Sequence, residues 1–172
     1  MDAGRTPSQT VGPYLHIGLD WLAAGQVIGT RGDLLITGTV YDGAGVPVDD
    51  ALIETWQADA AGRYGGLLDD LPLGFGRTAT DSAGRYRLRT DRPGAAPGDA
   101  SHLHVLIFMR GLLKPLLTRV YWPGDPAIGS DPVLQRVPAA RRASLLATAG
   151  DASQLHWDIH LQGPLETVFM EV

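Results

Sequence analysis

Glycine and proline interrupt this sequence at short intervals, a rhythm that is typical of short strands joined by turns. The 172 residues include 22 glycines and 12 prolines. The clearest segment between such interruptions is Arg85–Thr90, where Tyr86 and Leu88 alternate with three arginines. This alternation predicts a strand with one buried face and one exposed face. Several strands of this kind favour an all-β fold, and we predict an antiparallel β-sandwich.

Six other segments have the pattern or composition of strands. They cover residues 34–40, 51–57, 102–109, 116–122, 154–162 and 166–171. Tight turns are expected at Asp42–Gly45 and Asp81–Gly84. We predict one short helix, over residues 138–148, because proline suits a first helical turn and the arginines and leucines that follow have amphipathic spacing.

Composition narrows the class of protein. The chain is 44% hydrophobic and 19% charged, which indicates a globular protein, and we expect one domain over residues 1–172. Its 14 Lys and Arg against 19 Asp and Glu give a net charge of −5, which argues against nucleic acid or anionic lipid as a partner. We find no signal-peptide core and no stretch of roughly 18 apolar residues that would span a membrane. The lack of cysteine fits a reducing compartment, so the expected location is the cytoplasm.

The strongest candidates for chemistry are His102 and His104. Side chains two residues apart on a strand point to the same face, so the two imidazoles form half of a possible metal site. Two histidines could equally line a pocket. Tyr64 lies in a glycine-flanked loop after a strand, where it is either a packing residue or a phenolate ligand for a hard ion such as Fe(III). The residue types alone leave both interpretations open.

Two other groups have a simpler interpretation as surface. His156, Asp158 and His160 share one face of a predicted strand, which could bind a divalent metal or could simply face solvent. Arg110 could bind a carboxylate or could be an ordinary surface arginine. Motifs of serine or metal-dependent hydrolases, phosphate-binding loops and a cysteine nucleophile are absent from the sequence, so hydrolase functions have little support.

Four segments together resemble the intradiol ring-cleaving dioxygenases. In order along the chain, they are Thr6–Tyr14, Glu54–Asp59, Gly76–Asp81 and Gln162–Phe169. The resemblance covers nearly the whole chain and implies a β-sandwich. It also implies a non-haem Fe(III) held by two tyrosines and two histidines, to which a catecholic substrate binds before O₂ is inserted between the hydroxyl-bearing carbons. By this resemblance, Tyr64, His102 and His104 fall at three of the four ligand positions.

The fourth ligand position falls at Ala96, and a methyl group cannot bind iron. The family's catalytic chain has a tyrosine at the end of a Pro-Gly-Pro-Tyr loop there, and it has an arginine where this chain has Asp99. The resemblance therefore implies an incomplete remnant of a metal site, with no complete catalytic set in this chain. It is similar to the alpha chains of the family's two-chain members, in which a homologous beta chain holds the Fe(III). Alpha chains commonly lack the second histidine, whereas His104 is present here.

The resemblance also implies a role in the substrate pocket. An N-terminal arm, residues 1–30, would reach the substrate through Thr10, Gly12, Pro13 and Tyr14. Arg110 would bind the substrate carboxylate through paired donors. The implied reaction, carried out with the beta chain in an obligate αβ unit, is cleavage of protocatechuate by O₂ to 3-carboxy-cis,cis-muconate in aromatic catabolism. Such a unit needs a large apolar interface, where we expect Trp122 and Trp157 to be exposed.

Two alternatives remain open on the sequence. The chain could be a self-sufficient ferric dioxygenase of the catechol type, with the missing ligand supplied by Tyr86 or Tyr121. It could also be a non-enzymatic sandwich of the transthyretin-like kind that binds carbohydrate or peptide.

Overall fold

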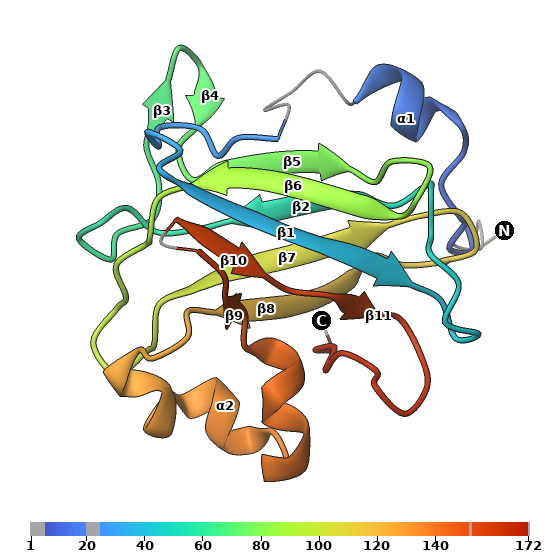
Figure 1. Cartoon of the computed structure of the whole chain (residues 1–172). Helices are drawn as coiled ribbons and strands as arrows, with labels where there is room; N and C mark the ends of the chain where they lie inside the picture. The colour runs from blue at the N-terminus through green and yellow to red at the C-terminus, as the bar shows by residue number, and fades with distance from the viewer. Residues whose placement is uncertain (1–5, 20–24, 152, 172) are drawn as a thin grey trace, which may run out of the picture.

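Two β-sheets that pack face to face form the body of the molecule (Figure 1), as predicted for an all-β sandwich. The computed structural model describes residues 6–19, 25–151 and 153–171. In the first sheet the order is β11 (Ile159–His160), β1 (Leu34–Tyr41), β10 (Gln154–His156) and β9 (Thr148–Ala149), and β6 (Arg85–Thr90) also pairs with β1. In the second sheet the order is β5 (Phe75–Ala79), β2 (Leu52–Trp56), β7 (His102–Phe108) and β8 (Leu116–Tyr121). A separate hairpin contains β3 (Leu67–Leu68) and β4 (Leu71–Pro72).

The helices of the described residues are short. They are α1 (Tyr14–Gly18), α2 (Pro132–Arg136) and two 3₁₀ helices, η1 (Pro126–Gly129) and η2 (Ala139–Leu145). The helix expected at 138–148 is therefore the 3₁₀ helix η2, and the others were not predicted. Figure 1 shows α1 and α2 on opposite sides of the sandwich. No helix in the described ranges is long and apolar enough to cross a membrane.

The core lies between the sheets and is built from alternating strand residues. In β6 the arginines are exposed while Tyr86 and Leu88 are buried, as predicted. The Tyr86 hydroxyl donates to the Trp157 carbonyl at 2.6 Å. Trp122 and Trp157 are each only 4% exposed, so the prediction that they are exposed at an interface was wrong. The reason for Trp157 is that it shares the inward face with Leu155 and Ile159.

Several strands differ from the sequence prediction. Residues 154–162 form two short strands, β10 and β11, both parallel to β1 rather than one continuous antiparallel strand. The strand pairing is interrupted between β10 and β11, where the Asp158 carboxylate accepts a hydrogen bond from Thr39 N at 2.8 Å. Within residues 166–171 only Met170 makes a β-bridge, to Leu117. The unpredicted strand β5 pairs with β2, and there the half-buried Glu54 carboxylate accepts hydrogen bonds from the Arg77 guanidinium.

Candidate functional site

His102 and His104 lie on the outer face of the second sheet, opposite two residues of β8. Direct cross-strand neighbours share a face, and the register places Tyr121 opposite His102 and Arg119 opposite His104. The Nε2 atoms of the two histidines are 3.3 Å apart, and the rings of His102 and Tyr121 have centroids 5.4 Å apart. The strand pairing thus brings two imidazoles, a phenol and a guanidinium together on one surface.

Tyr64 reaches this cluster from the loop after β2, and its ring centroid is 6.1 Å from that of His104. The loop Asp59–Tyr64 repeats the pattern Asp-x-Ala-Gly-Arg-Tyr of Asp81–Tyr86. In both loops the aspartate accepts backbone N–H donors two and four residues on, and it pairs with the arginine at 3.0 Å. Local hydrogen bonds therefore position Tyr64, a signal that the sequence analysis missed.

Ala96 lies in a loop that packs against the loop of Tyr64. Gly94 N donates to Asp59 O at 2.9 Å. Gly62 has φ of 77°, and a Cβ on this residue would lie 2.4 Å from the Ala95 carbonyl oxygen. Only glycine allows both this left-handed backbone and this close approach. The structure thus packs the loop that carries the fourth ligand position of the resemblance against the loop that carries the first, but the side chain at the fourth position is a methyl group.

Arg119 gives the cluster a fixed positive charge, because a guanidinium stays protonated in proteins. Burial, together with the charges of Arg119 and His102, lowers the pKa of His104 to about 4. Burial is also the largest cause that lowers the pKa of His102, although its hydrogen bond to Ala100 opposes this shift. Burial raises the pKa of Tyr64, against the opposing charge of Arg119. At neutral pH both imidazoles and the phenol are therefore uncharged.

The hydrogen bonds of the histidines assign their protons. His102 Nδ1 lies 2.8 Å from the Ala100 carbonyl oxygen, which can only accept, so Nδ1 carries the proton. The His102 Nε2 lone pair then accepts from His104 Nε2–H. The two Nε2 atoms are therefore donor and acceptor of the same hydrogen bond.

This cluster does not fit an Fe(III) ion. The ligand set implied by the resemblance has two tyrosines beside its imidazoles, but here only Tyr64 stands at such a position and Ala96 has no donor atom. The Nε atom of Arg119 is buried and has no hydrogen-bond partner in the described residues, so a guanidinium with one unsatisfied donor lies on the same face as the ligand positions. Within these same residues no three His, Cys, Asp or Glu side chains are arranged to hold a metal.

Neither alternative tyrosine completes the site. Tyr86 is buried between the sheets and is bonded to Trp157. The Tyr121 hydroxyl accepts from Arg119 Nη1 at 3.3 Å and donates to Asp131 Oδ1 at 3.1 Å. Burial and the Asp131 carboxylate raise the pKa of Tyr121, although Arg119 opposes them. Its phenol is thus held neutral by existing partners.

A second candidate region lies at the other end of β7, where the N-terminal arm meets Arg110. Gly111 N donates to Thr10 Oγ1 at 2.7 Å. A cavity of about 280 Å³ is lined by Val11, Gly12, Pro13, Leu15, Ile17, Asp50 and Arg110. The structure thus places Gly12 and Pro13 beside Arg110, and Tyr14 follows them with 79% of its surface exposed. Residues 1–5 and 20–24 of the predicted arm lie outside the described residues.

Asp50 forms an ion pair with Arg110 at this cavity, a pairing that the sequence analysis missed. Arg110 Nε donates to Asp50 Oδ2 across 60 residues of sequence, and the side chain of Arg110 remains 70% exposed. The bond uses Nε, and the two Nη groups carry the paired donors that can meet a carboxylate. The other lining residues are apolar or glycine.

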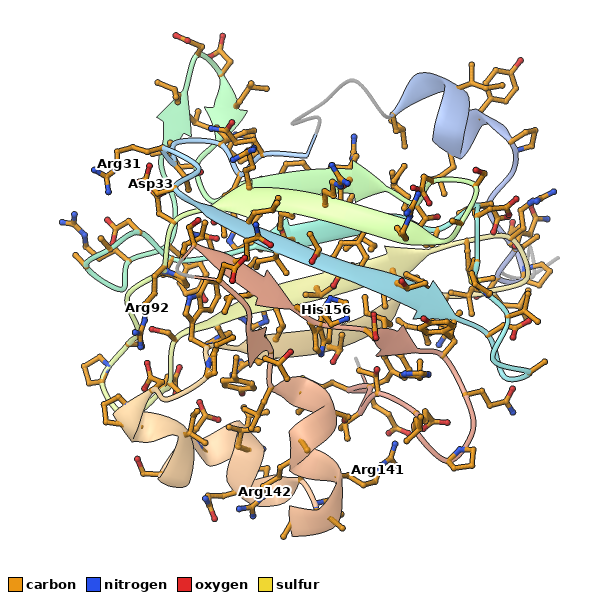
Figure 2. The ribbon with its side chains drawn as sticks, in the orientation of Figure 1. Arg31, Asp33, Arg92, Arg141, Arg142 and His156 are labelled. Carbon is orange, nitrogen blue, oxygen red and sulfur yellow. The ribbon has the colours of Figure 1, made fainter. Side chains whose placement is uncertain are left out.

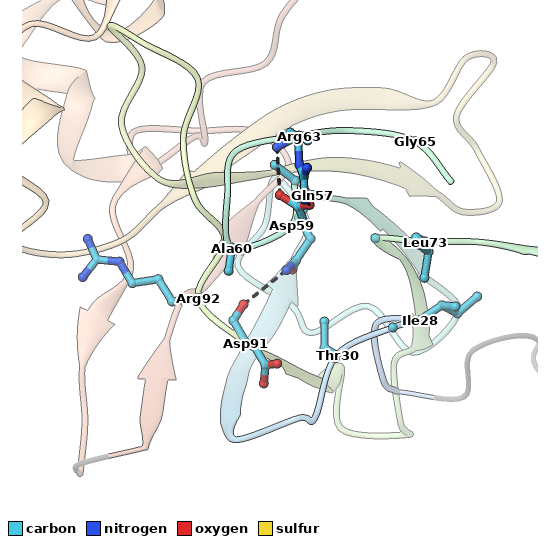
Figure 3. Close-up of a pocket in the computed structure, with 13 residues that line it drawn as sticks. Ile28, Thr30, Gln57, Asp59, Ala60, Arg63, Gly65, Leu73, Asp91 and Arg92 are labelled. Carbon is cyan, nitrogen blue, oxygen red and sulfur yellow. Dashed lines mark hydrogen bonds and ion pairs between the residues drawn. The ribbon is translucent and has the colours of Figure 1, made fainter. Parts of the chain in front are cut away.

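Two other regions are explained by their own contacts. A cavity of about 190 Å³ lies beside the Tyr64 loop (Figure 3), but polar groups that line it are already engaged: Asp59 pairs with Arg63, and Gln57 donates to the Asp91 backbone carbonyl. On the outer face of β10, His156 (Figure 2) is paired with Asp158 at 3.1 Å. His160 stacks on Tyr41 with centroids 4.9 Å apart. Contacts within the chain account for both regions.

A family model described as a dioxygenase matches residues 16–163 of the chain. This chain belongs to the intradiol dioxygenases. The protocatechuate 3,4-dioxygenase alpha chain of Burkholderia cepacia is 39% identical and is matched over 98% of both proteins. The protocatechuate 3,4-dioxygenase beta chain of the same organism is 36% identical, and the match covers 91% of this chain and 75% of that beta chain.

A solved structure supports the fold of this intradiol dioxygenase. The dioxygenase domain of a dioxygenase and carbohydrate-binding protein fusion from Streptomyces sp. SirexAA-E superposes with a TM-score of 0.61. It is 24% identical and covers 95% of this chain and 100% of that domain. Intradiol dioxygenases are oxidoreductases that use non-haem Fe(III).

Proposed function

We propose that this chain is the alpha subunit of a protocatechuate 3,4-dioxygenase and that it works only together with a beta chain that holds the Fe(III). One observation carries the proposal: the chain has a formed cavity with an arginine at its mouth, but its metal cluster lacks a donor at Ala96 and contains the cation of Arg119. Both kinds of relative, alpha and beta, resemble it over most of its length. The complex would convert protocatechuate and O₂ to 3-carboxy-cis,cis-muconate, with both oxygen atoms retained in the product.

In this proposal, the chain contributes binding and orientation. Arg110 binds the ring carboxylate through its Nη groups, and Asp50 holds the guanidinium by its Nε atom. Gly12 and Pro13 lie along the flat ring, because a residue without a side chain followed by one with a fixed φ lets the backbone come close. Thr10 anchors the arm by its bond to Gly111 N, and Tyr14 lies at the rim of the pocket. The partner's Fe(III) would supply the activation of the diol and O₂.

The surface around this cavity is suited to a partner chain. Tyr14, Ile17 and Leu113 are 79%, 71% and 63% exposed, and they surround the arm and the loop after β7. Exposed large apolar side chains beside a pocket mark an interaction surface. We propose that the beta chain covers them and completes the pocket, in an interface of the large apolar type, about 2,000 Å² or more.

Oxygen uptake tests this proposal. The chain is expressed alone, the matching beta chain is expressed alone, and the two are co-expressed, each with protocatechuate as substrate. We expect full-rate oxygen uptake and formation of the muconate product from the co-expressed pair only. Equal specific rates from this chain alone and from the pair would show that the proposed division of labour is wrong.

A further inference from the structure

The pairing of two strands fixes the position of Arg119. It is the direct cross-strand neighbour of His104 on β8, where Cβ atoms are about 5 Å apart. Its Nη1 donates to Tyr121, and Tyr121 donates to the fully buried Asp131 carboxylate. This relay holds the guanidinium on the sheet face that carries both histidines. No ion pair of the described residues involves Arg119.

The guanidinium is also incompletely satisfied. Its Nε atom is buried and makes no hydrogen bond to any described residue, an arrangement that costs free energy unless something favours the charge there. The neighbouring groups carry no positive charge at neutral pH: they are two neutral imidazoles and a phenol, with Asp99 within electrostatic range of Tyr64 and His102. Arg119 therefore meets no competing cation among them.

We propose that Arg119 occupies the cation position of this cluster, and that this charge, more than the missing donor at Ala96, keeps metal ions out of the chain. A metal ion bonded to the Nε2 atoms would lie about 2 Å from them, on the sheet face that also carries the permanent positive charge of Arg119 in a partly buried setting. Repulsion between a divalent ion and a unit charge is stronger in such a setting than in water. Restoring only the tyrosine would leave this repulsion in place. The inference rests on the cluster alone and holds whether or not the subunit function proposed above is correct.

The test is Co²⁺ binding to the full chain, measured by calorimetry and by the visible absorption of the ion. Five proteins are compared: the parent, Ala96→Tyr, Arg119→Gln, Ala96→Tyr with Arg119→Gln, and Ala96→Tyr with Arg119→Lys. Glutamine keeps a donor for Tyr121 but has no charge, whereas lysine keeps the charge. We expect the Ala96→Tyr/Arg119→Gln protein to bind Co²⁺ at least about 100-fold more tightly than Ala96→Tyr alone. The parent should show no saturable binding, and the lysine variant should bind no more tightly than Ala96→Tyr alone.

Two controls keep the result interpretable. Adding His104→Ala to the tightest variant must abolish binding, which excludes the exposed His156 and Asp158 as the source of the signal. Should Arg119→Gln fail to fold, Arg119→Leu takes its place as the charge-free residue in the same comparison. Binding by Ala96→Tyr, or by its lysine partner variant, as tight as in the charge-free variant would overturn the proposal.

Discussion

Replacing Arg110 with leucine is expected to lower kcat/KM of the assembled enzyme for protocatechuate by roughly 100-fold, with most of the change in KM. A paired, charge-assisted contact between a guanidinium and a carboxylate is among the stronger polar interactions in a binding site. Asp50 holds Arg110 from the Nε side, so leucine removes the cation and leaves the Asp50 carboxylate at the mouth of the cavity. An acid substrate would then meet a negative charge where it had met a positive one.

The choice of substrate separates this role from a structural one. Catechol lacks the carboxylate, so its kcat/KM should change little in the same variant. Arg110→Lys should recover part of the loss with protocatechuate, because lysine keeps the charge but not the paired geometry. An equal loss with both substrates would mean that Arg110 supports the fold or the interface and does not bind the carboxylate.

Replacing Asp131 with alanine is expected to lower the free energy of unfolding by about 4 kcal/mol. The Asp131 carboxylate is fully buried and accepts from Val133 N and Leu134 N at the start of α2, from Ala100 N and from the Tyr121 hydroxyl. Loss of an N-cap costs about 1 kcal/mol, and each buried donor left without a partner costs about 1–3 kcal/mol more. Urea denaturation measures the change. Asp81→Ala is the control, because Asp81 accepts a similar number of bonds in an exposed turn, and its loss should be much smaller.

The same carboxylate makes stability depend on pH. Burial raises the pKa of Asp131, but the combined hydrogen bonds from Ala100, Leu134, Tyr121 and Val133 outweigh it and leave the pKa below the ordinary value. The folded state therefore binds the proton less tightly than the unfolded state, whose pKa is about 3.9. The stabilisation is complete above the unfolded pKa and is lost as the pH falls through the folded pKa. Asp131→Ala should flatten the acid limb of the stability curve, and an unchanged limb would contradict this assignment.

Local patterns in the sequence predicted the parts of the fold that depend on neighbours along the chain. Alternation placed Tyr86 inside and the arginines of β6 outside, and the Asp-Gly turns formed as expected. Parallel pairing of β10 and β11 with β1 was not predicted, because register with a strand more than 100 residues away has no local signal. Trp157 was misjudged because its aromatic size was weighed above its place on the apolar face.

The candidate site divides in the same way. His102 and His104 were found from spacing on one strand, and Ala96 from the family resemblance. Arg119 was missed because its neighbourhood with His104 exists only through the β7 and β8 register. Asp50 was missed because its bond to Arg110 joins a turn before β2 to the end of β7, 60 residues on. Charged residues that are neighbours only through strand pairing or a long-range contact can be recognised only once the fold is known.

Iron content tests the division of labour most directly. The full chain is produced alone in iron-supplemented medium and is compared with the complex that it forms with the beta chain, by metal analysis and visible absorption. We expect an iron-free, colourless single chain and a complex that carries iron in proportion to its beta chain, with the red-brown absorption of tyrosinate bound to Fe(III). A single chain that contains stoichiometric ferric iron, shows this colour and cleaves protocatechuate would contradict it.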